Sequence, residues 1–258
     1  MRIVDCCVHP IQSANELELF SLNEESLSIS LSTLTTNMAS SQVSKALLTL
    51  FDTNFDASFP FANSQIFAYC SLADFTRQDS FERLQILVSR GIKAVMFHPY
   101  LQNLTREKWS AAVAFAREAQ KLGLFLCVCT AYGSERIYDI EVLPFAKVIV
   151  ESVDCPVVFS HGGGRQVLDA MLIADKYPNT FLETSFSLSY WLGSSVETDF
   201  AFAMRKLGAH RWLYGSDSPF ITMEKALADH LFFFERHHFK DSEIERIMSG
   251  NACEKLGL

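Results

Sequence analysis

Residues that could hold a metal ion or move a proton stand near the ends of five strand-like runs of the sequence. The runs are RIVDCCVHP, IKAVMFHPY, LFLCVCTAYG, PVVFSHGGG and RWLYGSDSP, and the residues are Cys7, His9, His98, Cys129, His161 and Asp217. Barrel enzymes assemble their active sites from groups at the carboxyl ends of different strands. The pattern therefore predicts that these six side chains meet at one end of a barrel.

The first run offers two metal ligands on one face. Because side chains alternate along a strand, we expect Asp5, Cys7 and His9 to point one way and Cys6 and Val8 to point the other. A thiolate and an imidazole would then be directed together into the barrel.

Two further ligands come from distant strands. Cys129 ends the fifth predicted strand on the same face as Cys127, and Asp217 ends the eighth, which neighbours the first in a closed barrel. Tetrahedral zinc accepts sulfur, nitrogen and carboxylate oxygen. We therefore predict zinc, or a similar divalent transition metal, bound by Cys7, His9, Cys129 and Asp217.

Strand and helix patterns alternate along the whole chain. Asp79 and Gly91 are expected to begin and end one helix, and Thr105 and Gly123 the next. Eight short aliphatic or β-branched runs read as strands: 2–7, 46–51, 65–71, 92–98, 124–130, 156–161, 180–185 and 211–216. This order predicts one domain over residues 1–258, a (β/α)8 TIM barrel of the α/β class, with an open doubly wound sheet as the alternative.

Composition favours a small-molecule partner. The formal net charge is -8, and no stripe of Lys and Arg interleaves with aromatic residues, so we expect no nucleic acid and no membrane partner. The first residues lack the pattern of a secretory signal, and an odd number of cysteines, seven, indicates reduced thiols, so a cytoplasmic location is expected. The sequence is compatible with either a monomer or a homo-oligomer.

The motifs together resemble those of a known group of enzymes. VDCCVHP, GIKAVMFHPY, FLCVCT, VVFSHGGG, LYGSDSP and the closing IMSGNACEKLGL are similar to the amidohydrolase superfamily, in the branch of TIM-barrel hydrolases that includes lactonases and decarboxylases of the aminocarboxymuconate-semialdehyde type. The resemblance spans nearly the whole chain. It implies two metal ligands from the first strand and one from the fifth, a histidine beside the reacting water from the sixth, and an aspartate on the eighth that binds metal and moves protons.

This sequence departs from that branch at two positions. Cys7 and Cys129 stand where the family usually has histidine. Two thiolates and the carboxylate of Asp217 would give the ligands a charge of -3, which exceeds the charge of a divalent ion and would weaken its effect on bound water.

The resemblance and the residues together predict a metal-dependent hydrolase of a small ester, lactone or amide. Asp217 would take a proton from water, and His161 would orient that water or polarise the substrate carbonyl. Their positions near predicted strand ends make the following residues candidates for substrate binding: His98, Tyr132, Arg136, Gly163, Arg165 and Ser185. A backbone amide of the HGGG run would donate to the oxyanion. The alternatives are a non-oxidative decarboxylase, a metal-free lactonase, or a catalytically inactive barrel used for binding.

Overall fold

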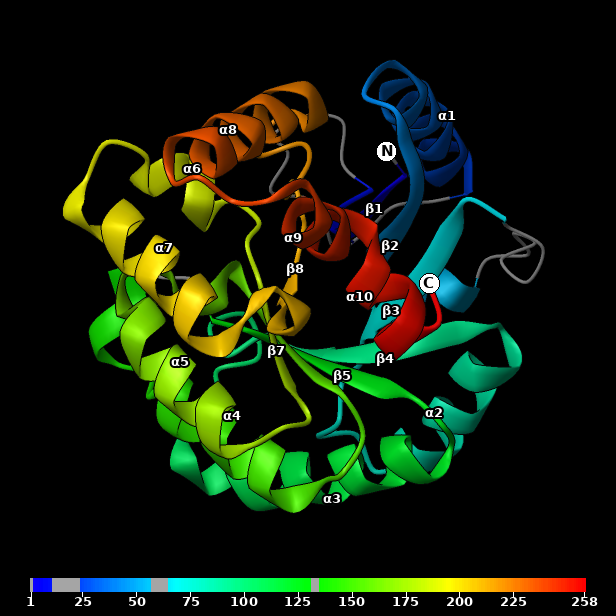
Figure 1. The fold of residues 1–258 in the computed structure, drawn as a ribbon. Helices are drawn as coiled ribbons and strands as arrows, with labels where there is room; N and C mark the ends of the chain where they lie inside the picture. Colours follow the sequence, from blue (N-terminus) through cyan, green and yellow to red (C-terminus); the bar gives the residue numbers. More distant parts are fainter. Residues whose placement is uncertain (1, 11–23, 57–64, 131–134) are drawn as a thin grey trace.

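The computed structural model describes residues 2–10, 24–56, 65–130 and 135–258 (Figure 1). Within these ranges eight parallel strands pair in sequence order. They are β1 (Ile3–Val8), β2 (Val43–Phe51), β3 (Phe67–Leu72), β4 (Ile92–Phe97), β5 (Phe125–Cys129), β6 (Val157–Ser160), β7 (Thr180–Glu183) and β8 (Trp212–Leu213). Each overlaps its predicted run, which confirms the (β/α)8 barrel.

The last strand is the shortest, because the chain beyond Leu213 pairs irregularly with β1. Tyr214 O accepts from Cys6 N at 2.9 Å, and Asp217 N donates to Cys7 O at 2.9 Å. A further bond joins His9 N to Ser218 O at 2.9 Å. These three bonds close the barrel and place the end of β1 beside the residues that follow β8.

Helices cover the outside of the barrel (Figure 1). In the described ranges they are α1 (Glu24–Ser40), α2 (Ser80–Ser89), α3 (Trp109–Lys121), α4 (Val142–Ser152), α5 (Val167–Lys176), α6 (Ser187–Trp191), α7 (Ser195–Leu207), α8 (Met223–Arg236), α9 (Asp241–Glu245) and α10 (Asn251–Leu256). Gly91 and Gly123 follow α2 and α3 with φ of 91° and 78°, the left-handed conformation expected of glycines that end helices.

The predicted helix starts are at the correct positions, but the expected capping hydrogen bonds from the side chains are not formed. Asp79 and Thr105 precede α2 and the 3₁₀ turn before α3, yet neither side chain caps the backbone. The carboxylate of Asp79 instead pairs with Arg77. The apolar faces of these helices, rather than their caps, hold them against the barrel.

Two hydrophobic layers follow from strand alternation. Inward side chains of all eight strands, among them Val4, Cys70 and Cys127, pack together inside the barrel. Outward side chains such as Ile3, Val128 and Phe159 pack against the helices. Because both faces of each strand are covered, the strands are nearly uninterrupted apolar runs, as parallel barrels require.

The last helix closes the end of the barrel opposite the predicted site. Asn251 Nδ2 donates, both at 2.7 Å, to Ala209 O in the 3₁₀ turn before β8 and to Trp212 O at the start of β8. Ala252, Leu256 and Leu258 then join the inner layer. The amino-terminal end of the barrel is thus plugged, which leaves its carboxyl end for chemistry.

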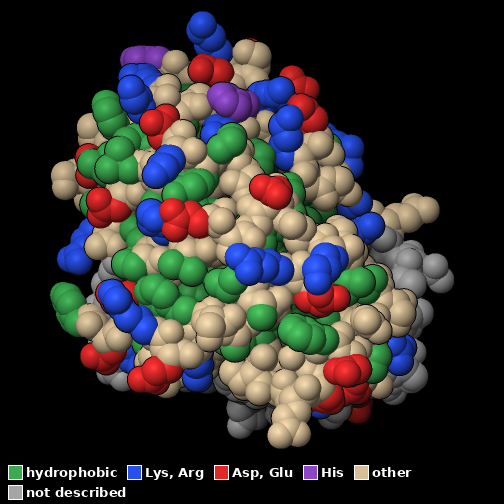
Figure 2. All heavy atoms as spheres, turned by 90° about the horizontal axis from the view of Figure 1, so that it is seen from below, with side chains coloured by type: hydrophobic (Ala, Val, Ile, Leu, Met, Phe, Trp, Pro, Cys, Tyr) green, Lys and Arg blue, Asp and Glu red, His purple; other side chains and the backbone are tan. Residues whose placement is uncertain are grey.

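The surface is mixed in character. On the face viewed from below, acidic, basic and hydrophobic side chains are interspersed (Figure 2). No helix in the described part of the chain combines the length and the apolar character needed to cross a membrane.

Candidate active site

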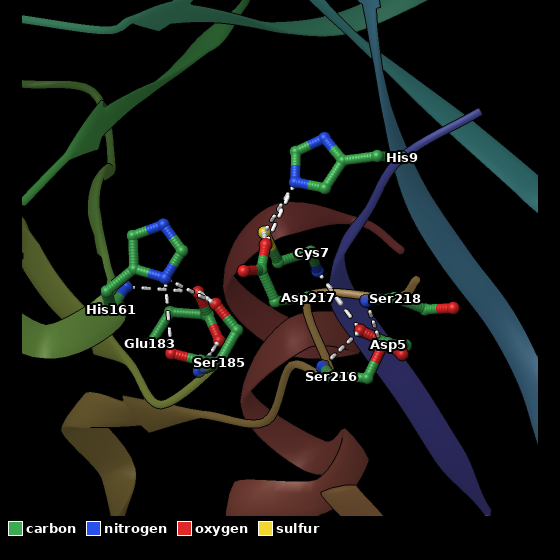
Figure 3. Close-up of polar contacts among 9 residues, drawn as sticks. All are labelled: Asp5, Cys7, His9, His161, Glu183, Ser185, Ser216, Asp217 and Ser218. Carbon is green, nitrogen blue, oxygen red and sulfur yellow. Dashed lines mark hydrogen bonds and ion pairs between the residues drawn. The ribbon is translucent and has the colours of Figure 1, made fainter. Parts of the chain in front are cut away.

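Three predicted metal ligands meet where β1 and β8 end (Figure 3). His9 Nε2 lies 2.9 Å from Asp217 Oδ1, and Cys7 Sγ lies 3.5 Å from the same oxygen and 3.8 Å from His9 Nε2. The three ligand atoms all lie within 4.8 Å of one another. Cys7 and Asp217 are buried and His9 is partly so, which makes the group a site open on one side.

A β-bulge, and not simple alternation, produces this convergence. The pairing of β1 with β2 shifts register between Asp5 and Val8, and Cys6 joins Val4 in the inner layer. Strict alternation would then send Cys7 to the outer face, but the extra residue of the bulge keeps it with His9. The predicted convergence is correct, whereas the predicted alternation through Cys6 is wrong.

Cys129 stands apart from this group. It ends β5 and is buried, but its sulfur is not among the ligand atoms that cluster within 4.8 Å in the described residues. Cys7 can converge with Asp217 because β1 is bonded directly to the segment after β8, whereas β5 lies across the barrel. Of the four predicted ligands, the structure therefore brings together Cys7, His9 and Asp217, and Cys129 as a fourth ligand stays a prediction.

The three donors suit a divalent transition metal. Sulfur, imidazole nitrogen and carboxylate oxygen are all zinc ligands, and catalytic zinc sites combine three protein ligands with an open position. Burial and the charge of Asp217 raise the pKa of the Cys7 thiol well above its ordinary value, so a cation is what would stabilise a thiolate there. One thiolate and one carboxylate give a ligand charge of -2, which balances a divalent ion.

Asp217 is held as an ionised carboxylate. Burial by itself raises the pKa of this group, but the hydrogen bonds from His9 and Cys7 and the electrostatic interaction with the imidazoles of His161 and His9 outweigh burial and hold the pKa below its ordinary value. Its backbone is left-handed, with φ of 66°. Such strain in a residue other than glycine costs of order 1–3 kcal/mol and clusters at functional sites.

His161 lies beside this group and rests on the end of β7 (Figure 3). Its Nδ1 lies 3.0 Å from Ser185 Oγ and 3.1 Å from Ser185 O. Ser185 Oγ in turn donates to Glu183 Oε2 at 2.7 Å. Like Asp217, His161 has a left-handed backbone, with φ of 67°.

Two buried acids in this region escaped the sequence-based prediction. Burial raises the pKa of Glu183 to about 7, against the electrostatic interaction with His161 and hydrogen bonds from Ser185 and from the His161 amide. Burial likewise raises the pKa of Asp5 to about 6, against bonds from Ser216 and Cys7. The available signal was an acid within an otherwise apolar strand, because buried carboxylates need a compensating role.

The HGGG run is shaped by packing. Gly163 N donates to Thr130 Oγ1 at 2.8 Å, so this amide already has an acceptor within the protein. A Cβ on Gly163, whose φ is 86°, would lie 2.7 Å from the Cβ of Ala170. The glycine is therefore required both for its backbone conformation and for the close approach of α5.

Of the remaining predicted substrate-binding residues, the structure describes His98, Arg136 and Arg165. His98 Nδ1 accepts from Leu101 N at 3.3 Å. Arg136 donates to Tyr100 O at 3.3 Å and to Asn103 Oδ1. Arg165 is exposed at the end of the HGGG turn, and Tyr132 lies outside the described residues.

Together these groups define a barrel enzyme with a candidate metal site at the carboxyl ends of its strands. The sequence matches the Amidohydrolase family over residues 68–258, well over half of the chain. The chain belongs to this family, which confirms the resemblance noted from its motifs and identifies the protein as an enzyme.

Solved structures share the fold along the whole chain. An uncharacterised TIM-barrel protein from Bordetella bronchiseptica has 18% identity and a TM-score of 0.75, covering 100% of this chain and 99% of its own. A zinc-bound amidohydrolase from Burkholderia multivorans has 15% identity and a TM-score of 0.69, covering 100% of both chains. A 2,6-dihydroxybenzoate decarboxylase from Rhizobium has 14% identity and a TM-score of 0.68, covering 100% of this chain and 99% of its own. No curated protein gave a significant match.

The packing of Gly163 predicts the cost of adding one methyl group. Gly163→Ala should lower the free energy of unfolding by about 1–3 kcal/mol more than Gly123→Ala, because it adds overpacking against Ala170 to the penalty of a positive φ. Gly123 is the matched control, since its φ is 78° and nothing lies within 4 Å of an added Cβ. Urea unfolding of both variants measures the difference; equal costs would contradict the packing argument.

The buried carboxyl of Glu183 predicts a pH dependence of stability. Its pKa rises from 4.5 to about 7 on folding, so the folded state binds the proton more tightly and this contribution to stability is lost as pH rises from 4.5 through 7. In metal-free protein, Glu183→Gln should remove part of that loss, on the order of 3 kcal/mol. Urea unfolding at pH 5 and pH 8 tests this, with Glu224→Gln on the surface of α8 as control. An unchanged slope in Glu183→Gln would refute the assignment.

Proposed function

We propose that this protein is a metal-dependent hydrolase of a small ester, lactone or amide. The observation that carries the proposal is the group formed by Cys7, His9 and Asp217 with His161 beside it. Members of the amidohydrolase family often use a divalent metal, and one structural neighbour contains zinc.

Cys7, His9 and Asp217 would hold the ion, most simply zinc. When bound, zinc would lower the pKa of a water molecule and polarise a substrate carbonyl. The balanced ligand charge preserves more of that effect than a site with two thiolates would.

Asp217 would act as the base. Its contacts with Cys7 and His9 both use Oδ1, so Oδ2 is the oxygen that would take a proton from the attacking water. The lowered pKa keeps this carboxylate ionised near neutral pH. After attack, Asp217 would return the proton to the leaving oxygen or nitrogen, while His161 orients the water.

The ligand set predicts different effects for the two cysteines. Cys129→Ser should keep about one equivalent of zinc, whereas Cys7→Ser should bind zinc at least about tenfold more weakly because it removes a ligand. Elemental analysis and competition with a chelator, both under reducing conditions, give occupancy and affinity. If Cys129→Ser loses zinc as completely as Cys7→Ser, Cys129 is a fourth ligand; if the parent protein binds none, the metal-dependent proposal fails.

The proposed role of Asp217 as the base predicts how the substitution Asp217→Asn affects turnover. Asp217→Asn keeps the size and one oxygen but removes the base, so turnover of small esters, lactones or amides should fall by about 100-fold or more. Asp169→Asn, on the exposed face of α5, controls for the loss of one negative charge. The substrate panel includes nitrophenyl esters, simple lactones and aromatic carboxylic acids.

The same panel separates the alternatives. Release of carbon dioxide from an aromatic acid, without hydrolysis, would replace the proposal with decarboxylation, the reaction named for the Rhizobium neighbour. Lactone hydrolysis that survives complete removal of metal would indicate a metal-free lactonase. No turnover of any member by zinc-loaded protein would favour the binding barrel.

A further inference from the structure

We propose that Glu183 is a positioning residue that acts through Ser185 to hold His161 in a single tautomer, with the proton on Nδ1 and a lone pair on Nε2. The juxtaposition that carries the proposal is the chain of contacts from Glu183 through Ser185 to His161 at the ends of β6 and β7 (Figure 3). None of these three residues belongs to the ligand group.

The carbonyl of Ser185 assigns the proton on the imidazole. His161 Nδ1 lies 3.1 Å from Ser185 O, and a carbonyl oxygen can only accept a hydrogen bond. A lone pair on Nδ1 would face the lone pairs of that oxygen. The carbonyl therefore favours the proton of a neutral His161 on Nδ1.

The hydroxyl of Ser185 supports the same tautomer only if its own hydrogen points elsewhere. Glu183 supplies that second acceptor, because Oε2 lies 2.7 Å from Ser185 Oγ. With its hydrogen directed to Glu183, Ser185 Oγ presents a lone pair to Nδ1 at 3.0 Å. Without Glu183, the hydroxyl could turn its hydrogen toward Nδ1 and favour the opposite tautomer.

The hydrogen-bond donors around the Glu183 carboxylate all come from Ser185 and His161. Besides the hydroxyl of Ser185, it accepts from the backbone N–H of Ser185 and, at 3.3 Å, from that of His161. All three donors thus belong to the two residues that it positions. A Cβ on Gly215 would lie 2.2 Å from Glu183 Oε1, so the glycine after β8 also leaves space for this carboxylate.

The tautomer decides what His161 can do. A lone pair on Nε2, the ring nitrogen away from Ser185, accepts a hydrogen bond from water, whereas an Nε2–H group would instead donate to a carbonyl. This consequence rests on the proposed hydrolase. The tautomer itself does not depend on any substrate.

Nuclear magnetic resonance of protein labelled with ¹⁵N in its histidine rings tests the proposal on the full chain, with His161→Gln used to assign the signals. Wild-type His161 should show the Nδ1–H pattern. Glu183→Gln should shift His161 at least partly toward Nε2–H, because the side-chain amide leaves one donor unmatched and frees the hydroxyl of Ser185. In a Ser185→Ala background, Glu183→Gln should have no such effect, since no hydroxyl remains to turn.

Thr184→Val is the matched control. Thr184 is equally buried on the same strand end, but its Oγ1 lies 2.7 Å from His230 Nε2 and makes no contact with His161. This variant should move the signals of His230 and leave those of His161 unchanged. If Glu183→Gln fails to fold, Glu183→Asp takes its place, because the shorter side chain withdraws the acceptor from Ser185 Oγ and should cause the same shift of His161 toward Nε2–H.

Two results would overturn the proposal. One is an Nε2–H tautomer in the wild-type protein, and the other is a His161 spectrum that is the same in folded Glu183→Gln as in wild type. Both are independent of turnover. If the tautomer is as expected and no ester, lactone or amide is hydrolysed, the positioning role stands and the proposed hydrolase fails.

Discussion

The carboxylate of Asp5 is the constraint on which the candidate site depends. One oxygen, Oδ1, accepts from Cys7 N at 3.1 Å and from Ser216 N at 2.9 Å. It therefore fixes the bulge of β1 and the segment after β8 at the same time. Cys7 and Asp217, 210 residues apart in sequence, come into contact because these two backbone segments share one acceptor. An apolar residue at position 5 would leave both amides without it.

Three buried carboxylates surround the site, and their environments drive their pKa values apart. For Asp5 and Glu183 burial outweighs the hydrogen bonds that they accept, so their pKa values rise to about 6 and about 7. Asp217 faces two imidazoles, which outweigh burial and lower its pKa. Such divergence is how one site holds an ionised carboxylate for chemistry beside others that serve as hydrogen-bond acceptors.

In the proposed metal site, a thiolate at position 7 would change the electrostatics. With a neutral ligand at that position, Asp217 alone would bring negative charge to the ion. With Cys7 the ligands would carry two negative charges, which would make the site neutral when a divalent ion is bound. A neutral site attracts anionic substrates less than a positive one does, which fits the choice of a neutral ester, lactone or amide in the proposed reaction.

Local patterns in the sequence were enough to predict the strands, the barrel and the positions of Cys7, His9, His161 and Asp217 at strand ends, because hydrophobic runs and helix-ending glycines are short-range signals. Tertiary structure decided the rest. The bulge at Cys6 and Cys7 depends on an acceptor shared with the segment after β8, the separation of Cys129 depends on the position of β5 around the barrel, and the contact of Glu183 with His161 depends on the pairing of β7 with β6. Each of these depends on which residues far apart in the chain lie near one another. The sequence of a single strand does not specify its distance from another strand.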